Sequence, residues 1–172
     1  MYKNHKKNWK AVMDYANGVR DGTIKANHYR ILGVERFFRD LEDPRYELKP
    51  DDADFCINII ESTLCHAQGE AINGTPMRGK PFLLEPFQKF IIYNLMWFKI
   101  KGTDILRFHE ALIFLPRKNS KTSLVAGLAW AMSLLYRKSG SKCYIASSAL
   151  IQSLEAFNFL TYNIKNMGEW DK

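Results

Sequence analysis

The sequence predicts an α/β fold in which a helical front half is followed by a strand, a turn, a helix and a second strand. In the front half, apolar residues recur at helical spacing over residues 6–20 and again over 27–41. The back half contains two short, unbroken apolar runs, residues 111–115 and 143–146, on either side of a long apolar helix. Two such runs joined by a helix form a βαβ unit, whose strands lie parallel in one sheet.

Three further elements are expected between these two halves. A third helix is expected to begin at Asp51, where carboxylates meet the positive end of the helix dipole. Glycines and prolines recur between residues 67 and 86, which indicates a loop. A strongly apolar helix follows from Pro86 to about Ile100, and Pro86 suits its first turn because proline has no N–H to leave unpaired.

These elements divide the chain into two predicted regions. Residues 1–66 form a helical N-terminal region, and residues 67–172 form the start of an α/β domain. In the second region the strand 111–115 leads through a polar turn into the helix 121–136.

Composition and charge restrict the class of protein. A chain of 172 residues with 47% hydrophobic and 25% charged residues is globular, which excludes disordered and fibrous classes. The longest apolar stretch runs only from Leu124 to Met132, short of the roughly 18 residues of a membrane span. Three cysteines without a CxxC pair favour a reducing compartment, so we expect a cytoplasmic protein with no membrane partner. The net charge of +7 favours a polyanionic partner.

The turn before the helix 121–136 has the context of a phosphate-binding loop. A buried strand is expected to lead into it, a helix N-terminus follows it, and Lys121 and Thr122 stand at the start of that helix. A lysine there neutralises β- and γ-phosphate charge, and a hydroxyl ligates Mg²⁺. The alternative is an ordinary capped helix start with an incidental Lys-Thr pair.

The consensus for such loops differs from this sequence at two positions. It places glycines where this chain has Leu115 and Ser120. Ser120 therefore either adopts a left-handed conformation, at a cost of about 1–2 kcal/mol, or holds a different loop.

The segment Phe114–Ser123 resembles the deviant Walker A motif of phage terminase large subunits, in which a P-R-K-N-G-K-[ST] string is typical. Such loops lack the first glycine, so only Ser120 departs from the family pattern. The resemblance extends to three further segments in the right order. Residues 84–91 resemble the family's adenine-binding motif, residues 144–157 its next strand and helix, and residues 34–41 an N-terminal helix of the tailed-phage branch.

The resemblance, together with the chemistry of the side chains, implies a role for each site residue. Lys121 and Arg117 are the candidate catalytic residues on the phosphates, and Thr122 is the candidate Mg²⁺ ligand. Gln88 has an amide that can donate to adenine N7 and accept from N6. The alternatives are a surface or DNA-facing cation for Arg117 and a solvent-facing polar residue for Gln88. The full set expected to bind ATP is Gln88, Arg117, Lys118, Asn119, Ser120, Lys121, Thr122 and Ser123.

The resemblance also implies a P-loop NTPase-type parallel sheet with flanking helices and a function in viral DNA packaging. The family couples ATP hydrolysis to translocation of double-stranded DNA into procapsids. Its partners are the terminase small subunit and the portal protein, in the cytoplasm of the host cell, and the full-length protein forms a homo-oligomeric ring. Two alternatives remain: another P-loop ATPase such as a helicase-like translocase, and a non-enzymatic basic DNA-binding module.

A P-loop motor also needs acidic residues after the loop to hold Mg²⁺ and orient the attacking water. The acids that follow Lys121 are Glu155, Glu169 and Asp171, and none stands at the end of an apolar strand. The metal-dependent nuclease of full-length family members is not in this sequence. We therefore expect an incomplete ATPase domain, and a chain that by itself binds nucleotide weakly, does not turn it over and does not cut DNA.

Overall fold

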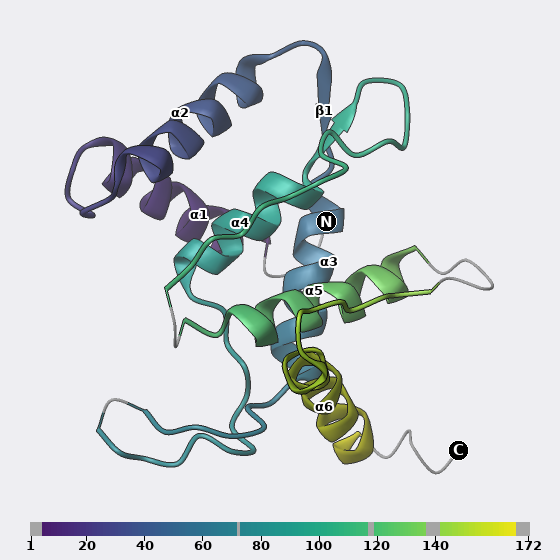
Figure 1. Cartoon of the computed structure of the whole chain (residues 1–172). Helices are drawn as coiled ribbons and strands as arrows, with labels where there is room; N and C mark the ends of the chain where they lie inside the picture. The colour runs from purple at the N-terminus through teal and green to yellow at the C-terminus, as the bar shows by residue number, and fades with distance from the viewer. Residues whose placement is uncertain (1–4, 72, 117–118, 137–141, 168–172) are drawn as a thin grey trace. The chain divides into compact units, whose positions relative to one another are not determined.

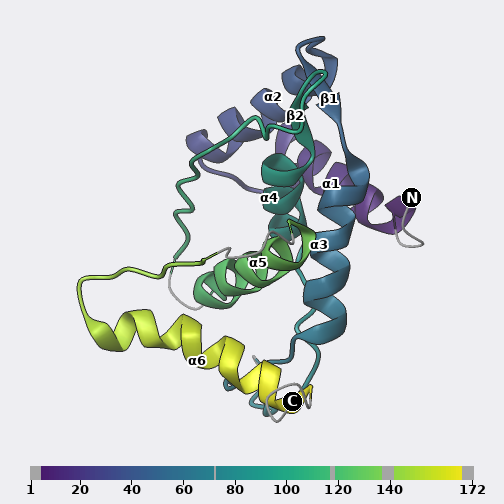
Figure 2. The same cartoon turned by 90° about the vertical axis from the view of Figure 1, so that its right-hand side faces the viewer.

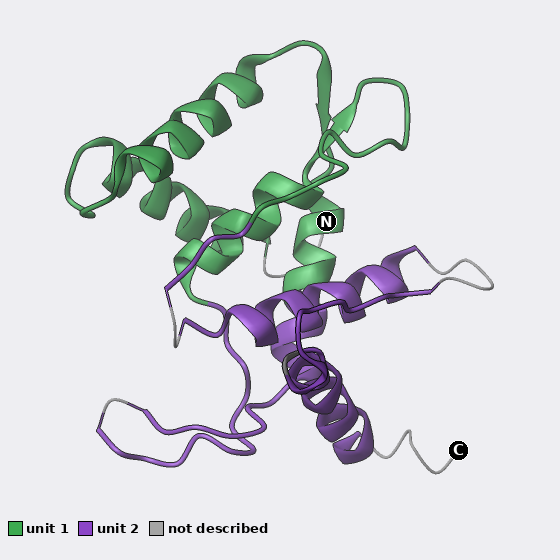
Figure 3. Cartoon of the chain, in the orientation of Figure 1, with its two compact units in different colours: residues 1–57, 85–112 green, residues 58–84, 113–172 purple. Residues whose placement is uncertain are grey.

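The structure, a computed structural model, describes residues 5–71, 73–116, 119–136 and 142–167, without the side chain of residue 152. The chain forms two compact units (Figure 3). Unit 1 contains residues 1–57 and 85–112, and unit 2 contains residues 58–84 and 113–172. The elements, labelled in Figures 1 and 2, are α1 His5–Arg20, α2 His28–Glu42, β1 Tyr46–Leu48, α3 Pro50–Thr63, α4 Pro86–Met96, β2 Phe98–Ile100, α5 Lys121–Leu135 and α6 Leu150–Asn166.

The helices predicted from apolar spacing are confirmed, with one difference at the end of α4. This helix ends at Met96 instead of continuing to Ile100, because the chain then forms β2. β2 pairs antiparallel with β1, and Leu48 stands opposite Phe98. The two strands form the one sheet of the described residues. Since this pairing joins segments far apart in sequence, helical periodicity gave no sign of it.

The predicted parallel sheet is not formed by the residues that the structure describes. Residues 111–115 and 143–146 belong to no strand, and side chains within both runs are exposed: Leu112 by 95%, Phe114 by 91% and Tyr144 by 83%. A strand of a parallel sheet is buried on both faces and pairs its backbone with neighbours. Neither condition is met here, so the apolar runs indicated β propensity without specifying a partner.

Aromatic rings form the core of unit 1. Trp9 of α1 contacts Trp97, with ring centroids 4.3 Å apart and an edge-on geometry, and it also meets Tyr93 at 6.0 Å. Phe37 of α2 is fully buried and packs on Phe90 of α4 at 5.1 Å. Edge-on aromatic pairs are favourable beyond the area they bury, so this cluster ties α1 and α2 to α4.

A buried carboxylate joins three helices of the same unit. Asp54 of α3 is 0% exposed and accepts hydrogen bonds from the Tyr93 hydroxyl at 2.7 Å and from Asn8 Nδ2 at 3.0 Å. His5 Nδ1 contacts its second oxygen. The buried Lys89 ammonium donates to Asn8 Oδ1 at 3.0 Å, which extends the network. A carboxylate this deeply buried is tolerated only when donors surround it.

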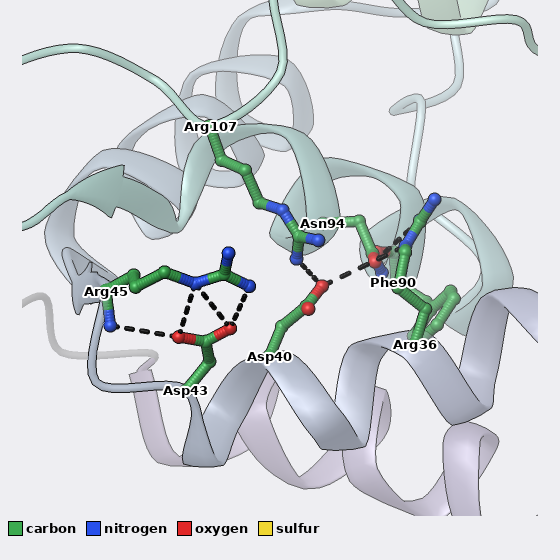
Figure 4. Close-up of polar contacts among 7 residues, drawn as sticks. All are labelled: Arg36, Asp40, Asp43, Arg45, Phe90, Asn94 and Arg107. Carbon is green, nitrogen blue, oxygen red and sulfur yellow. Dashed lines mark hydrogen bonds and ion pairs between the residues drawn. The ribbon is translucent and has the colours of Figure 1, made fainter.

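A second polar cluster fixes the end of α2 (Figure 4). Asp40 is 5% exposed and forms an ion pair with Arg107, whose guanidinium also lies 4.4 Å from the centroid of the Tyr46 ring. Arg36 Nε lies 3.9 Å from Asp40 Oδ2, and Arg36 Nη2 donates to Asn94 Oδ1 at 3.3 Å. Because one carboxylate serves two guanidinium groups, these residues hold the 101–109 segment and α4 against α2.

In unit 2, α5 and α6 pack side by side. Gly127 of α5 lies against α3, since a Cβ built on it would stand 3.1 Å from Leu64 and 3.3 Å from Ile60. Asn163 of α6 donates to Cys65 O at 3.2 Å and accepts from Cys65 N at 2.6 Å. This pair of bonds anchors the loop of residues 65–81 on α6. No helix of the described residues is both long and apolar enough to cross a membrane.

The Asp54 network makes a prediction about stability. Asp54→Ala leaves the donors on His5, Asn8 and Tyr93 without their acceptor, and we expect a loss of about 3 kcal/mol in the free energy of unfolding. The matched control is Asp14→Ala, which removes an exposed carboxylate from α1 and is expected to change stability by less than about 0.5 kcal/mol. Urea unfolding followed by tryptophan fluorescence measures both, and equal effects would contradict the prediction.

A second prediction concerns alkaline pH. Burial and the Asp54 carboxylate raise the pKa of Tyr93, and burial raises the pKa of Cys56 to about 12. Both groups bind their protons more tightly in the folded state than in the unfolded state. Their contribution to the free energy of unfolding is therefore complete below their ordinary pKa values, near 9 for the thiol and 10 for the phenol. That contribution falls as the pH rises. We expect stability to fall between about pH 9 and 12 by up to about 1.4 kcal/mol per pH unit for each group. Urea midpoints across this range should fall less steeply in Cys56→Ala and Tyr93→Phe, and unchanged slopes would refute the assignment.

Candidate nucleotide-binding loop

The candidate loop, residues 114–123, consists of a turn and the first residues of α5. The turn ends at Ser120, the residue that caps the N-terminus of α5. Ser120 has φ 50° and ψ 28°, the left-handed conformation, and it is the one residue other than glycine with positive φ among the described residues. This is the position where the loop consensus has glycine. Of the two outcomes open to the sequence, the chain therefore takes the strained one, since glycine alone adopts this conformation without steric cost.

Two side chains of the loop donate to main-chain carbonyls of the same loop. Lys121 Nζ donates to Leu115 O at 3.3 Å, and Asn119 Nδ2 donates to Pro116 O at 3.3 Å. Lys121 and Asn119 are both exposed. The loop thus folds back so that the ammonium group of Lys121 stays beside the residues that precede the turn. A long bond to a neutral carbonyl is readily exchanged for one to a phosphate oxygen.

The start of α5 offers main-chain donors. The first N–H groups of an α-helix have no intrahelical partner, and Ser120 makes no side-chain cap that would occupy one. The first intrahelical bond at this end runs from Leu124 N to Ser120 O at 2.8 Å. Thr122 and Ser123 lie half-buried in this first turn. Such an end suits an anion, because the dipole and the free N–H groups act together. The predicted residues Arg117 and Lys118 lie outside the described residues.

Gln88, the predicted adenine reader, lies in unit 1 at the first turn of α4, whereas the loop belongs to unit 2. Its side chain is 2% exposed, and its Oε1 accepts a hydrogen bond from the N–H of Glu85 at 2.9 Å. This is one half of a capping box, with Glu85 at the N-cap and Gln88 at the third helical position. Sequence reasoning missed Glu85 as the partner of Gln88. The spacing of an N-cap candidate and a glutamine three residues later, with Pro86 between them, was the available signal.

The donor set of the loop fits a nucleotide-bound magnesium ion. Among the described residues, no group of three or more His, Cys, Asp or Glu side chains could hold a metal by itself. Magnesium bound with a nucleotide takes most of its ligands from phosphates and water, and one hydroxyl from the protein suffices to position it. Thr122, the residue predicted for this role, stands beside Lys121 in the first turn of α5.

Comparison with known families agrees with the resemblance seen in the sequence. The family model described as "Terminase large subunit, ATPase domain" matches residues 86–170, a range that contains both Gln88 and the whole loop. Comparisons with curated proteins and with solved structures gave no match. The predicted resemblance is therefore confirmed: residues 86–170 of this chain match the ATPase domain family of terminase large subunits.

Proposed function

We propose that the loop of residues 114–123 binds ATP with Mg²⁺ and that the chain supplies the ATPase part of a viral DNA-packaging motor. The observation that carries this proposal is the left-handed Ser120 between Asn119 and Lys121, at the N-terminus of a helix within the matched ATPase family. The P-loop consensus has glycine at this point, the residue that adopts a left-handed backbone without strain, and here that backbone is adopted without glycine.

Each loop residue then has a stated task. Lys121 leaves Leu115 O and moves to the β- and γ-phosphates, where its charge offsets theirs. Main-chain N–H groups from Asn119 to Ser123 surround the phosphate oxygens. Arg117 places a planar group of donors on the γ-phosphate, and Lys118 adds positive charge beside it.

Thr122 is the residue that would hold Mg²⁺, through its hydroxyl. The bound ion would supply positive charge that offsets the charge developing on the phosphates during hydrolysis. The protein's own part is to fix the hydroxyl in the first helical turn, where the adjacent Lys121 approaches the same phosphates.

The wider role follows from the family and from charge. We propose that the whole protein uses ATP hydrolysis to move double-stranded DNA into procapsids, in the cytoplasm of the host cell. The proposed protein partners are a terminase small subunit, a portal protein and further copies of the same chain in a ring. The net charge of +7 supports a polyanionic substrate.

The first test of this function removes the lysine. Lys121→Ala deletes the charge that faces the phosphates, and we expect MgATP binding to weaken at least about tenfold. Isothermal titration calorimetry on the full chain measures the dissociation constant. Lys142→Ala makes the same charge change at an exposed position outside the loop and should leave the constant unchanged. Equal affinities of wild type and Lys121→Ala would overturn the proposed site.

The second test uses the strained backbone of Ser120. A β-branched residue tolerates a left-handed conformation less well than serine, so Ser120→Val should weaken MgATP binding by about tenfold, which is about 1.4 kcal/mol. Ser120→Gly relieves the same strain and should bind at least as tightly as wild type. The two variants serve as controls for each other under the same titration. Tighter binding by Ser120→Val than by Ser120→Gly would show that the bound loop does not use this conformation.

A further inference from the structure

We propose that one face of α2 is a docking surface for an acidic, amphipathic helix of a partner protein. This face holds a groove of about 540 Å³, and we call it the α2 groove. It lies within unit 1 and contains no residue of the nucleotide-binding loop, so the proposal goes beyond the proposed function. The residues that line the α2 groove are Tyr29, Leu32, Gly33, Glu35, Arg36 and Arg39.

The N-terminal half of the α2 groove is apolar and exposed. Tyr29 is 81% exposed and Leu32 is 49% exposed, and the two side chains are neighbours on the helix surface. Nearer the C-terminal end of α2, the segment of residues 101–109 packs against the helix through the ion pair of Arg107 with Asp40 (Figure 4). An aromatic ring and a leucine side by side on an exposed helix face suit a protein partner, which can cover both.

Gly33 lies in the middle of the groove, and the packing of the described residues gives no reason for a glycine there. A Cβ built on Gly33 would meet nothing within 4 Å. Gly127 of α5 differs, because a Cβ built on it would stand 3.1 Å from Leu64. A glycine inside a helix destabilises it relative to alanine. Without a side chain at position 33, however, a second helix can approach the backbone of α2 closely, which accounts for the glycine.

The C-terminal half of the α2 groove belongs to a cluster with excess positive charge. Burial and the charge of Arg39 lower the pKa of Arg36, and burial and the charges of both arginines lower the pKa of Arg107. Asp40 pairs with Arg36 and Arg107. Arg39 is exposed and has no ion-pair partner within the described part of the chain. A carboxylate from a partner would therefore relieve the repulsion among these guanidinium groups.

The mixture of side chains favours a protein helix over a nucleic acid. A nucleic-acid backbone carries a negative charge at every nucleotide, so it would meet the carboxylate of Glu35 as well as the arginines. It would also leave the apolar half of the groove uncovered. A helix with apolar residues on one face and acidic residues on one flank covers Tyr29 and Leu32 and pairs with the arginines at the same time.

The experiment titrates a fluorescein-labelled, helix-stapled peptide with the full 172-residue chain and follows fluorescence anisotropy. The peptide has about 18 residues, with leucines on one helical face and glutamates on its flanks. We expect a dissociation constant of about 10 μM or tighter, and at least about tenfold weaker binding when lysines replace the glutamates. No binding of the glutamate peptide, or equal binding of the two peptides, would overturn the proposal.

Gly33→Gln fills the groove without changing its charge. We expect the affinity for the glutamate peptide to fall at least about tenfold. Since a side chain at this position has open space and glutamine favours the helix more than glycine does, the variant should be at least as stable as wild type in urea unfolding. An unchanged affinity would show that the peptide binds elsewhere, and the proposal would be wrong.

A matched pair of variants tests the charge. Arg39→Gln and Arg30→Gln each remove one charge from an exposed arginine of α2, and of the two residues Arg39 alone lines the groove. We expect Arg39→Gln to weaken binding of the glutamate peptide about three- to fivefold and Arg30→Gln to leave it unchanged. Equal effects would reduce the interaction to general charge attraction and refute the assigned surface.

Two further measurements distinguish the other occupants. If Gly33→Gln weakens binding of a DNA duplex of about 20 base pairs and spares the peptide, the groove contacts nucleic acid and the proposal fails. It fails also if ultracentrifugation shows a wild-type dimer and a Gly33→Gln monomer, because the groove is then an interface between copies of this chain. The affinity for MgATP should be the same in both proteins. A wild type that binds the peptide but no MgATP would contradict the proposed function and support the α2 groove.

Discussion

The buried carboxylate of Asp54 is the interaction on which the arrangement of unit 1 depends. It accepts from side chains of α1 and α4, which are far from it in sequence, and it lies in α3. Burying the Asp54 carboxylate at 0% exposure would cost much free energy without these donors. Each helix must therefore lie where its donors reach the carboxylate. The aromatic core around Trp9 and Trp97 packs between α1 and the end of α4, two of the elements that the polar network also joins.

The N-terminal cap of α4 involves a residue of the candidate site. The N–H of Glu85 holds Gln88 in a fixed orientation, so a residue expected to contact the nucleotide is also part of the helix start. The loop shows a similar sharing of roles. Ser120 caps the N-terminus of α5 and adopts a left-handed backbone at the position where the loop consensus has glycine, and Lys121 and Asn119 donate to carbonyls of the same loop. At the starts of both α4 and α5, the helix terminus sets the position of the side chain that is proposed to act in function.

Sequence reasoning was right where chemistry is local. Apolar spacing predicted α1 and α2, and Pro86 predicted the start of α4. The polar turn predicted the start of α5 at Lys121, and the family comparison confirmed the resemblance to terminase large subunits. The assignment of this turn to nucleotide binding stays a prediction. Sequence reasoning failed where the structure depends on pairing between segments that are distant in sequence. The parallel strands at 111–115 and 143–146 were not formed, and the end of α4 became β2 because β1 was available to pair with it.

The sequence by itself determined the helices and the turn before α5, because each depends on residues within about four to ten positions of one another. It also determined the family, because the motifs that carry the resemblance follow one another in order along the chain. Only the tertiary structure decided that Asp54 of α3 would be the buried acceptor for donors from α1 and α4 and that Asp40 would pair with Arg107. It also decided that Ser120 would take the strained backbone and that the oxygen of Gln88 would serve the helix. These outcomes depend on burial and on partners that folding brings together. The sequence does not show whether a given carboxylate or amide will be solvated or buried.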